Sequence, residues 1–314
     1  MRGKSEILRL VEISRLYYEE GLTQAEIAKK LDISRPAVSK LLSEAKLRGI
    51  VKIEIKSPLE SNENLLQTLA ERYNLEGGLI VQTGASEPAL RKRFFTSQAS
   101  EYVEKMIHEV IHVGLGWGSE TGSIIDELHT IPQVTQGNGT VCPLLGSAPN
   151  DIKWFQSNEL VRIFSNKTGY TPYYLPAPAF PMSVHNKRLF EQTNEYKKVS
   201  SLWDRLDMAL LGIGTYPSVP DQATAARFGN KLKKEGAVGM MATYYFDRHG
   251  RFIESENDIV IRIPLEALRK TRIVLAVGSG LEKIHAIIGA LKTGLITYLV
   301  TDEETAQKVI EVDS

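Results

Sequence analysis

Hydrophobic residues near the start of the chain recur at the three- and four-residue spacing of amphipathic helices. A first helix is predicted from Ile7, Leu10, Val11, Ser14 and either Tyr17 or Tyr18, and Gly21 ends it. A second helix begins at Thr23, where Glu26 three residues later completes a capping-box pattern. Its predicted buried face consists of Ile27, Ala28 and Leu31. The pattern therefore predicts two short helices before residue 32.

A third helix follows the short connection Asp32-Ile33, and Asp is one of the few non-glycine residues that adopt the left-handed conformation of a tight turn. Ser34 is a favourable N-cap, and Pro36 stands in the first turn, where a missing N–H is harmless. The predicted buried stripe consists of Val38, Leu41, Leu42 and Ala45. Residues 50–56 then alternate apolar and charged, as a half-exposed strand does. These elements predict a winged helix-turn-helix.

Beyond residue 57 the pattern changes to short apolar runs separated by helical segments. Such runs are typical of strands buried on both faces of a parallel sheet. The clearest runs lie at 78–81, 209–213, 273–277 and 296–300. A proline and small or polar residues at 57–62 indicate a linker, and 63–73 is predicted as a helix. We therefore expect a winged helix-turn-helix domain at 1–57 and an α/β domain at 58–314.

Composition excludes several classes of protein. The 314 residues are 42% hydrophobic and 24% charged, with a single cysteine, so neither a disordered chain nor a small disulfide-stapled fold is expected. The sequence contains no apolar run of the roughly 18 residues that a membrane span needs and no apolar segment of a signal peptide at its start. We expect a soluble, cytoplasmic protein that does not associate with membranes.

A net charge of zero conceals an asymmetry between the two predicted domains. Residues 1–57 contain twelve Lys and Arg against eight Asp and Glu, a net charge of +4, and the remainder carries −4. A basic head on an acidic body indicates a polyanionic partner for the head alone.

The face of the third helix opposite its apolar stripe carries cations, hydroxyls and a methyl group, which can meet phosphates and base edges in a major groove. Arg35, Ala37 and Ser39 are candidates for base contacts, and Lys40 is a candidate for phosphate contacts. The full set of candidate DNA-binding residues is Thr23, Gln24, Ser34, Arg35, Pro36, Ala37, Ser39 and Lys40. A three-helix protein-binding domain with a solvated basic face is the alternative.

Six segments carry a resemblance to one family. The segment TQAEIAKKLDISRPAVSKLL, followed by RGIVKIEI, is similar to the DNA-binding head of the SorC family of bacterial sugar-responsive transcriptional regulators. The family's effector domain is matched in order and spacing by GLGWGSE (114–120), YLPAPAF (174–180), LLGIGT (210–215), AVGMMATYYFDRHG (237–250) and EKIHAIIGALKTGLITYLVTDEETA (282–306). The resemblance covers nearly the whole chain.

The resemblance implies an α/β body with a Rossmann-like sheet of the sugar-phosphate isomerase type. It also implies a DNA-binding regulator of a carbohydrate-metabolism operon, controlled by a phosphorylated sugar or related metabolite. The partners implied are operator DNA, the small-molecule effector and further copies of the chain, commonly in a homotetramer.

Glycine-rich loops after predicted strands are the candidate effector site. On spacing alone, 113–121 is a weak signal for anion binding at a helix start, and glycines that merely permit tight strand-to-helix packing are the alternative. The resemblance implies effector contacts from Gly118, Ser119, Gly146, Ser147, Gly280 and Lys283. Lys283 is the strongest candidate, as a point charge for a phosphate. Ser119 is expected to touch that phosphate in preference to Glu120.

Two residues depart from the family pattern. Met240 stands where many relatives carry an aspartate, and Leu145 stands where some carry a lysine. An apolar residue facing sugar hydroxyls would leave those hydroxyls unpaired. The hypothesis is that the effector is less hydroxylated or differently oriented than in those relatives, or that the pocket is vestigial.

Residues 108–112 spell His-Glu-Val-Ile-His, the pattern of zinc peptidases. That chemistry needs both imidazoles on one face of a continuous helix. The β-branched residues Val110, Ile111 and Val113, just before a glycine-rich turn, predict a strand instead. We expect neither a metal nor a cofactor.

An enzyme is the alternative function, because sugar-phosphate isomerases and deaminases share the implied body fold. They need a carboxylate and a second acid or base at the sugar. Asp247 lies in Tyr-Phe-Asp-Arg-His-Gly at 245–250, which is more simply a hairpin turn. No acid–base pair or catalytic residue is identified, so a regulator is expected.

Overall fold

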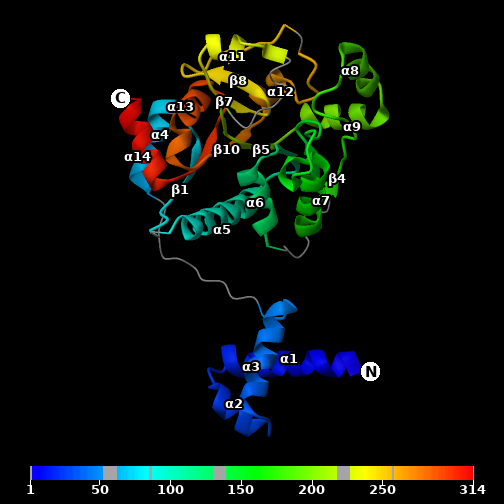
Figure 1. Ribbon diagram of the computed structural model, residues 1–314, viewed down its shortest axis with the longest axis vertical. Helices are drawn as coiled ribbons and strands as arrows, with labels where there is room; N and C mark the ends of the chain where they lie inside the picture. The colour runs from blue at the N-terminus through cyan, green and yellow to red at the C-terminus, as the bar shows by residue number, and fades with distance from the viewer. Residues whose placement is uncertain are drawn as a thin grey trace. The chain divides into compact units, whose positions relative to one another are not determined.

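The computed structural model describes residues 2–51, 62–84, 87–129, 139–217, 227–256 and 258–313, with side chains from residue 7 onward. The chain divides into two compact units, Met1–Pro58 and Leu59–Ser314 (Figure 1). Each unit has its own hydrophobic core. In the described ranges, no helix combines the length and apolar character that crossing a bilayer requires.

The first unit contains the three predicted helices, α1 (Arg2–Tyr18), α2 (Gln24–Lys30) and α3 (Arg35–Leu47). The capping box of α2 is confirmed: Glu26 N donates to Thr23 Oγ1, and Thr23 N donates to the Glu26 carboxylate. Asp32 has φ of 51°, so the predicted left-handed turn between the helices is also confirmed. Ser34 caps α3 by accepting from Ala37 N. The start of each of these two helices is thus fixed by local hydrogen bonds.

The core of this unit joins all three helices and consists of Ile13, Leu16, Ile27, Val38 and Leu42. The predicted stripe of α3 is confirmed, with Leu41 only partly buried. The predicted stripe of α1 is wrong at Ile7, which is 47% exposed, because the buried positions of this helix begin only at Leu10. The strand predicted at 50–56 lies, apart from Ile50 and Val51, outside the described residues.

The second unit is built on a seven-stranded sheet in which all the pairings are parallel. In spatial order its strands are β1 (Gly77–Val81), β11 (Tyr298–Asp302), β10 (Ile273–Val277), β5 (Met208–Gly212), β2 (His112–Leu115), β3 (Thr140–Pro143) and β4 (Thr171–Pro172). Four of these strands were predicted from apolar runs. The run at 296–300 begins the strand too early, because β11 starts at Tyr298.

Helices cover both faces of this sheet (Figure 1). One layer contains α4 (Glu63–Tyr73), α9 (Asn194–Trp203), α12 (Leu265–Lys270), α13 (Ile284–Lys292) and α14 (Glu303–Val312). The other layer contains α5 (Pro88–Ile107), α6 (Ser119–Glu127) and α7 (Ser157–Thr168). The helix α4 has the bounds predicted for it.

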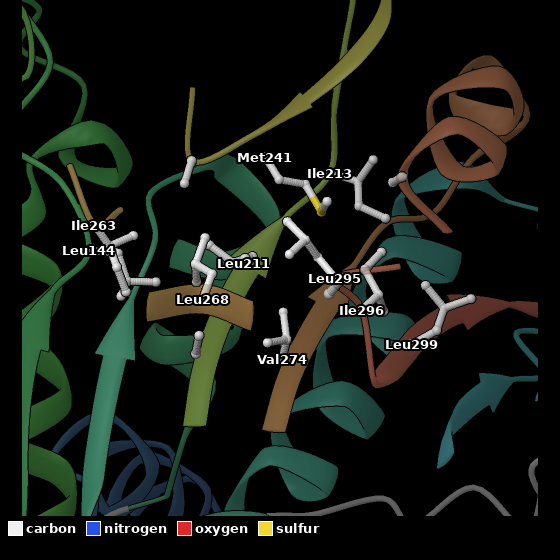
Figure 2. Packing of buried hydrophobic residues seen from close by; sticks show 14 of the residues in the cluster. Leu144, Leu211, Ile213, Met241, Ile263, Leu268, Val274, Leu295, Ile296 and Leu299 are labelled. Carbon is white, nitrogen blue, oxygen red and sulfur yellow. The ribbon is translucent and has the colours of Figure 1, made fainter. Parts of the chain in front are cut away.

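Because both faces are covered, successive strand residues enter different cores. In β10, Val274 packs into the first layer and Leu275 into the second. Figure 2 shows side chains of the first layer packed together, among them Leu211, Val274 and Leu268. This two-sided burial explains why the strands read as continuous apolar runs.

A second, antiparallel sheet was not predicted as a separate element. Its strands are β6 (Gly214–Thr215), β7 (Ala237–Met241), β8 (Tyr244–Asp247) and β9 (Phe252–Ile253). It packs on α13, where a Cβ added to Gly289 would lie 2.7 Å from the Asp247 carbonyl oxygen. The hairpin turn predicted at Asp247 is confirmed, because its carboxylate accepts from His249 N and Arg251 N.

The other helices in the described part of the chain connect these elements. They are η1 (Lys153–Phe155), α8 (Val184–Glu191), α11 (Lys231–Lys234) and η2 (Leu281–Lys283). Of these, η2 follows β10 directly and begins the segment that leads into α13.

Replacing the cap of α2 tests the local hydrogen bonds of the first unit. Thr23→Ala removes the hydroxyl that accepts from Glu26 N, at a cost of about 1 kcal/mol. Backbone amides of α2 should then exchange with solvent deuterium about fivefold faster in the intact chain. Thr23→Ser, which keeps the hydroxyl, should exchange like the wild type. Equal exchange in Thr23→Ala would contradict a stabilising role for this cap.

Acid should weaken the same cap. The hydrogen bonds from the Thr23 backbone N–H and hydroxyl lower the pKa of Glu26 below its ordinary value. A lowered folded-state pKa means that the stabilisation is present above the unfolded pKa and is lost as the pH falls through the folded one. Exchange in α2 should therefore accelerate, after correction for intrinsic rates, only below the ordinary pKa of a glutamate. Glu26→Gln should abolish that acid-dependent step.

Candidate functional site

The exposed face of α3 is the first candidate site. Arg35, Ser39 and Lys40 are exposed, and Ala37 is partly so, while Val38 and Leu42 on the opposite face are buried in the core. Neither Arg35 nor Lys40 forms an ion pair within the described part of the chain. The helix therefore presents two cationic side chains to solvent from a backbone anchored at its N-terminus.

The other sequence-predicted residues of this site occupy the helix starts. The hydroxyls of Thr23 and Ser34 accept the capping hydrogen bonds of α2 and α3. Gln24 is the first residue of α2, and Pro36 lies in the first turn of α3. Thr23 and Ser34 thus position the two helices, and their hydroxyls are engaged in doing so.

The loops after β10, β2 and β3 form the second candidate site. These strands belong to one parallel sheet, in which β5 pairs with both β10 and β2, and β2 pairs with β3. Parallel pairing places the carboxyl ends of the strands at a common edge, where ligands of open α/β sheets bind. The glycine-rich segments predicted to bind the effector follow these ends.

An ion pair joins two of these loops across the edge. The Lys283 ammonium at the end of η2 contacts Glu120 Oε2 at 2.5 Å. Glu120 Oε1 accepts from Ser279 N at 3.1 Å and from Ser279 Oγ at 2.9 Å. The side chains of Lys283 and Glu120 are only 17% and 15% exposed. Lys283 therefore reaches the predicted site, and a carboxylate of the chain is its partner.

The start of α6 lies at the same carboxyl edge of the sheet. Its N-cap is Gly118, which has φ of 139° and no side chain to cap the helix. Ser119 is exposed, and its carbonyl accepts from Ser123 Oγ. Two residues further, Thr121 is fully buried, and its hydroxyl has no hydrogen-bond partner among the residues that the structure describes.

Gly280 contributes through its backbone. Its φ of 102° lies in the region that favours glycine. Its N–H donates to Asp302 Oδ2 at 3.1 Å and to Thr305 Oγ1 at 2.9 Å. These hydrogen bonds tie the loop after β10 to the start of α14 and hold the neighbouring Ser279 toward Glu120.

The loop after β3 is engaged in packing. Gly146 N donates to the Ile261 carbonyl, and Ser147 N donates to the Ala177 carbonyl. A Cβ at residue 146 would lie 2.6 Å from the Ala177 oxygen, so a close approach of two backbones requires this glycine. Gly146 and Ser147 thus hold the segment that contains Ala177, and the Gly146 N–H is engaged by the protein itself.

The two residues that depart from the family pattern lie in packed clusters. Leu145 is fully buried in the first layer of the main core. Met240 packs on the cluster of Phe228, Leu232, Tyr245 and Ile253. That their replacement alters the ligand stays a prediction.

Two features of this edge were missed by the sequence reasoning. Trp117 has its ring centroid 6.1 Å from that of Phe155 and 6.3 Å from that of Phe180, so three aromatic rings gather beside the start of α6. The second is the pairing of Glu120 with Ser279 and Lys283. The signal available in the sequence was the opposite charge of Glu120 and Lys283, each in a helical segment that follows a strand.

The histidine pattern does not form the geometry of a zinc peptidase. The helix α5 ends at Ile107 with His108 as its C-cap, and His112 begins β2. The strand prediction is right for His112 and Val113 and wrong for His108, Val110 and Ile111, because α5 occupies the chain up to Ile107 and β2 begins only at His112. Within the described ranges, no group of three or more His, Cys, Asp or Glu side chains could hold a metal ion.

Comparison with known proteins gives matches over both units. Residues 57–311 match the family model of a putative sugar-binding domain, and residues 11–48 match that of sigma-70 region 4. The sorbitol operon regulator of Klebsiella pneumoniae is 26% identical over 99% of this chain and 100% of its own length. The deoxyribonucleoside regulator of Bacillus subtilis is 29% identical over 96% of each chain.

A solved structure agrees with this assignment. The crystal structure of the full-length sorbitol operon regulator SorC from Klebsiella pneumoniae has a TM-score of 0.74 and 25% identity, and the match covers 97% of this chain and 98% of that one. The helix-turn-helix head and the Rossmann-like body predicted from the sequence are therefore confirmed. The chain belongs to the SorC family of transcriptional regulators, whose bodies are putative sugar-binding domains.

Proposed function

We propose that α3 lies in the major groove of operator DNA. The observation that carries this proposal is that two cations, Arg35 and Lys40, are exposed and form no ion pair with other described residues, on a helix whose opposite face is buried. Arg35, Ala37 and Ser39 contact base edges, and Lys40 contacts a phosphate. In this proposal Gln24 and the capped starts of α2 and α3 lie at the sugar-phosphate backbone of the DNA and support the docking there.

The body senses a small molecule, a sugar or a related metabolite. The support for this is the family of the body and the names of full-length relatives, which regulate sorbitol and deoxyribonucleoside genes. The effector binds at the carboxyl edge of the sheet, near Gly118, Ser119, Gly280 and Lys283, with Gly146 and Ser147 holding the neighbouring segment. That the protein is a homotetramer stays a prediction.

Control of DNA binding follows from linkage. An effector changes operator occupancy only by its differential affinity for the DNA-binding and non-binding arrangements of the protein. The isomerase alternative is not supported, because relatives that match over the full length are named as regulators. In this proposal the task of the body is therefore recognition of a metabolite without its conversion.

Arg35→Ala tests the base contact. It should weaken specific binding by about 1–3 kcal/mol and relax the base preference at one position. Fluorescence anisotropy on the DNA flanking the protein's own gene, against a scrambled duplex, measures both effects. Arg35→Lys keeps the charge and loses the bidentate fork, so it should retain non-specific affinity and lose selectivity. Wild-type selectivity in both variants would contradict the proposed contact.

Lys40→Ala tests the phosphate contact. All duplexes should bind more weakly, and the slope of log affinity against log salt should fall by about one charge contact. The matched control is Lys197→Ala, which removes an exposed lysine from α9 in the body and should leave the slope unchanged. An unchanged slope in Lys40→Ala would place this lysine outside the DNA interface.

A further inference from the structure

Three donors at the effector edge converge on one carboxylate of the chain. They are the Ser279 N–H, the Ser279 hydroxyl and the Lys283 ammonium, and they contact Glu120 at 3.1, 2.9 and 2.5 Å. A backbone N–H, a hydroxyl and an ammonium together form the donor set that binds an oxyanion. Glu120 thus takes the position that the anionic group of a ligand would take.

The pair that results is neutral and largely withdrawn from water. Both side chains are at least four-fifths buried, so their attraction is screened less than that of a surface pair. A phosphate ester that reached Lys283 would have to break this ion pair and then stand beside the displaced carboxylate. Like charges at close range in a partly buried site repel strongly. The edge is therefore unfavourable for a phosphate group.

The same edge suits an uncharged ligand rich in hydroxyls. A carboxylate offers about four lone-pair sites and an ammonium three donors, so both keep capacity beyond their mutual contact. Next to them, the Thr121 hydroxyl is fully buried without a hydrogen-bond partner among the described residues. This hydroxyl is 3.1 Å from the point where a Cβ on Gly212 would lie, at the end of β5.

An aromatic surface adds to this fit. The Trp117 ring, partly buried beside Phe155 and Phe180, directly precedes Gly118 at the start of α6. Aromatic faces pack against apolar surface, including the C–H face of a sugar ring or polyol chain. Aromatic rings and a charged pair together provide apolar and polar contacts from one edge.

We propose that Glu120 determines the ligand class of this edge, which takes an uncharged sugar or sugar alcohol and rejects its phosphate ester. The inference rests on the proposed function, in which this edge holds the effector. It differs from the phosphorylated sugar that the family resemblance implies. That expectation assigned Lys283 to a phosphate and did not take into account that Lys283 is paired with Glu120. Glu120 is here a specificity-determining residue that acts through Lys283 and Ser279.

Inorganic phosphate is the first probe, because it carries the rejected group alone. The intact wild type should show no thermal stabilisation by phosphate relative to chloride at equal ionic strength. Glu120→Gln keeps the shape of the side chain and removes its charge, so it should bind phosphate about tenfold tighter or more. Glu120→Thr, a second variant that removes the carboxylate, should behave alike. Adding Lys283→Met to either variant should abolish the gain.

The second probe is a panel of four- to six-carbon aldoses and sugar alcohols, each paired with its terminal phosphate ester. Isothermal titration of the wild type should give tighter binding for the uncharged member of a pair, and Glu120→Gln should narrow or reverse that preference. A phosphate ester that binds the wild type more tightly than its parent would overturn the inference. So would phosphate binding by the wild type equal to that of both Glu120 variants.

These outcomes are independent of the proposed function's own test. Failure of the wild type to bind operator DNA would contradict the regulator mechanism and leave the phosphate measurements unaffected. Conversely, wild-type operator binding together with unchanged phosphate affinity in both Glu120 variants would refute the ligand class alone.

Discussion

Parallel pairing of β10, β5 and β2 is the constraint on which the effector edge depends. It brings together loops that are far apart in the sequence, so that Glu120 meets Ser279 across 159 residues and Lys283 across 163. No local preference produces this meeting. The helices that cover both faces of the sheet bury its strands and leave the strand ends as the places where polar side chains gather.

Electrostatics differ between the two units in a way that matches their tasks. The head keeps Arg35 and Lys40 exposed and unpaired among the described residues, as a partner with regularly spaced phosphates requires. In the body, Lys283 is paired and mostly buried. A lysine is thus available for a polyanion in one unit and neutralised in the other. Lysine therefore has a different role in each unit, because Lys40 is open to a polyanion and Lys283 is held by Glu120.

Local signals in the sequence predicted the head well. The Thr23 cap, the left-handed Asp32 and the Ser34 cap depend only on neighbouring residues, and all three are formed. The apolar runs likewise predicted the main strands, because burial on both faces makes each run continuous. The exposed Ile7 was missed because periodicity cannot tell how far along α1 its partners extend.

Contacts between residues far apart in the chain could not be predicted from the sequence. The family resemblance led to Lys283 as a site residue, and nothing local revealed that Glu120 is its partner. Gly146 was expected at the effector and that role stays a prediction, but its close approach to Ala177 is a packing requirement that only the folded chain shows. The strand predicted from Val110, Ile111 and Val113 is shorter than expected, because α5 packs into the core up to Ile107 and β2 begins only at His112.

Footprinting of the intact protein on the DNA that flanks its own gene is the most direct test of the central claim, that α3 lies in the major groove of operator DNA. The account predicts a protected site whose major-groove guanine and adenine edges are shielded from methylation, and whose protection is lost in a variant that lacks both cations of α3. Protection that persists without those cations, or the absence of any protected site across salt concentrations and sugars, would contradict it.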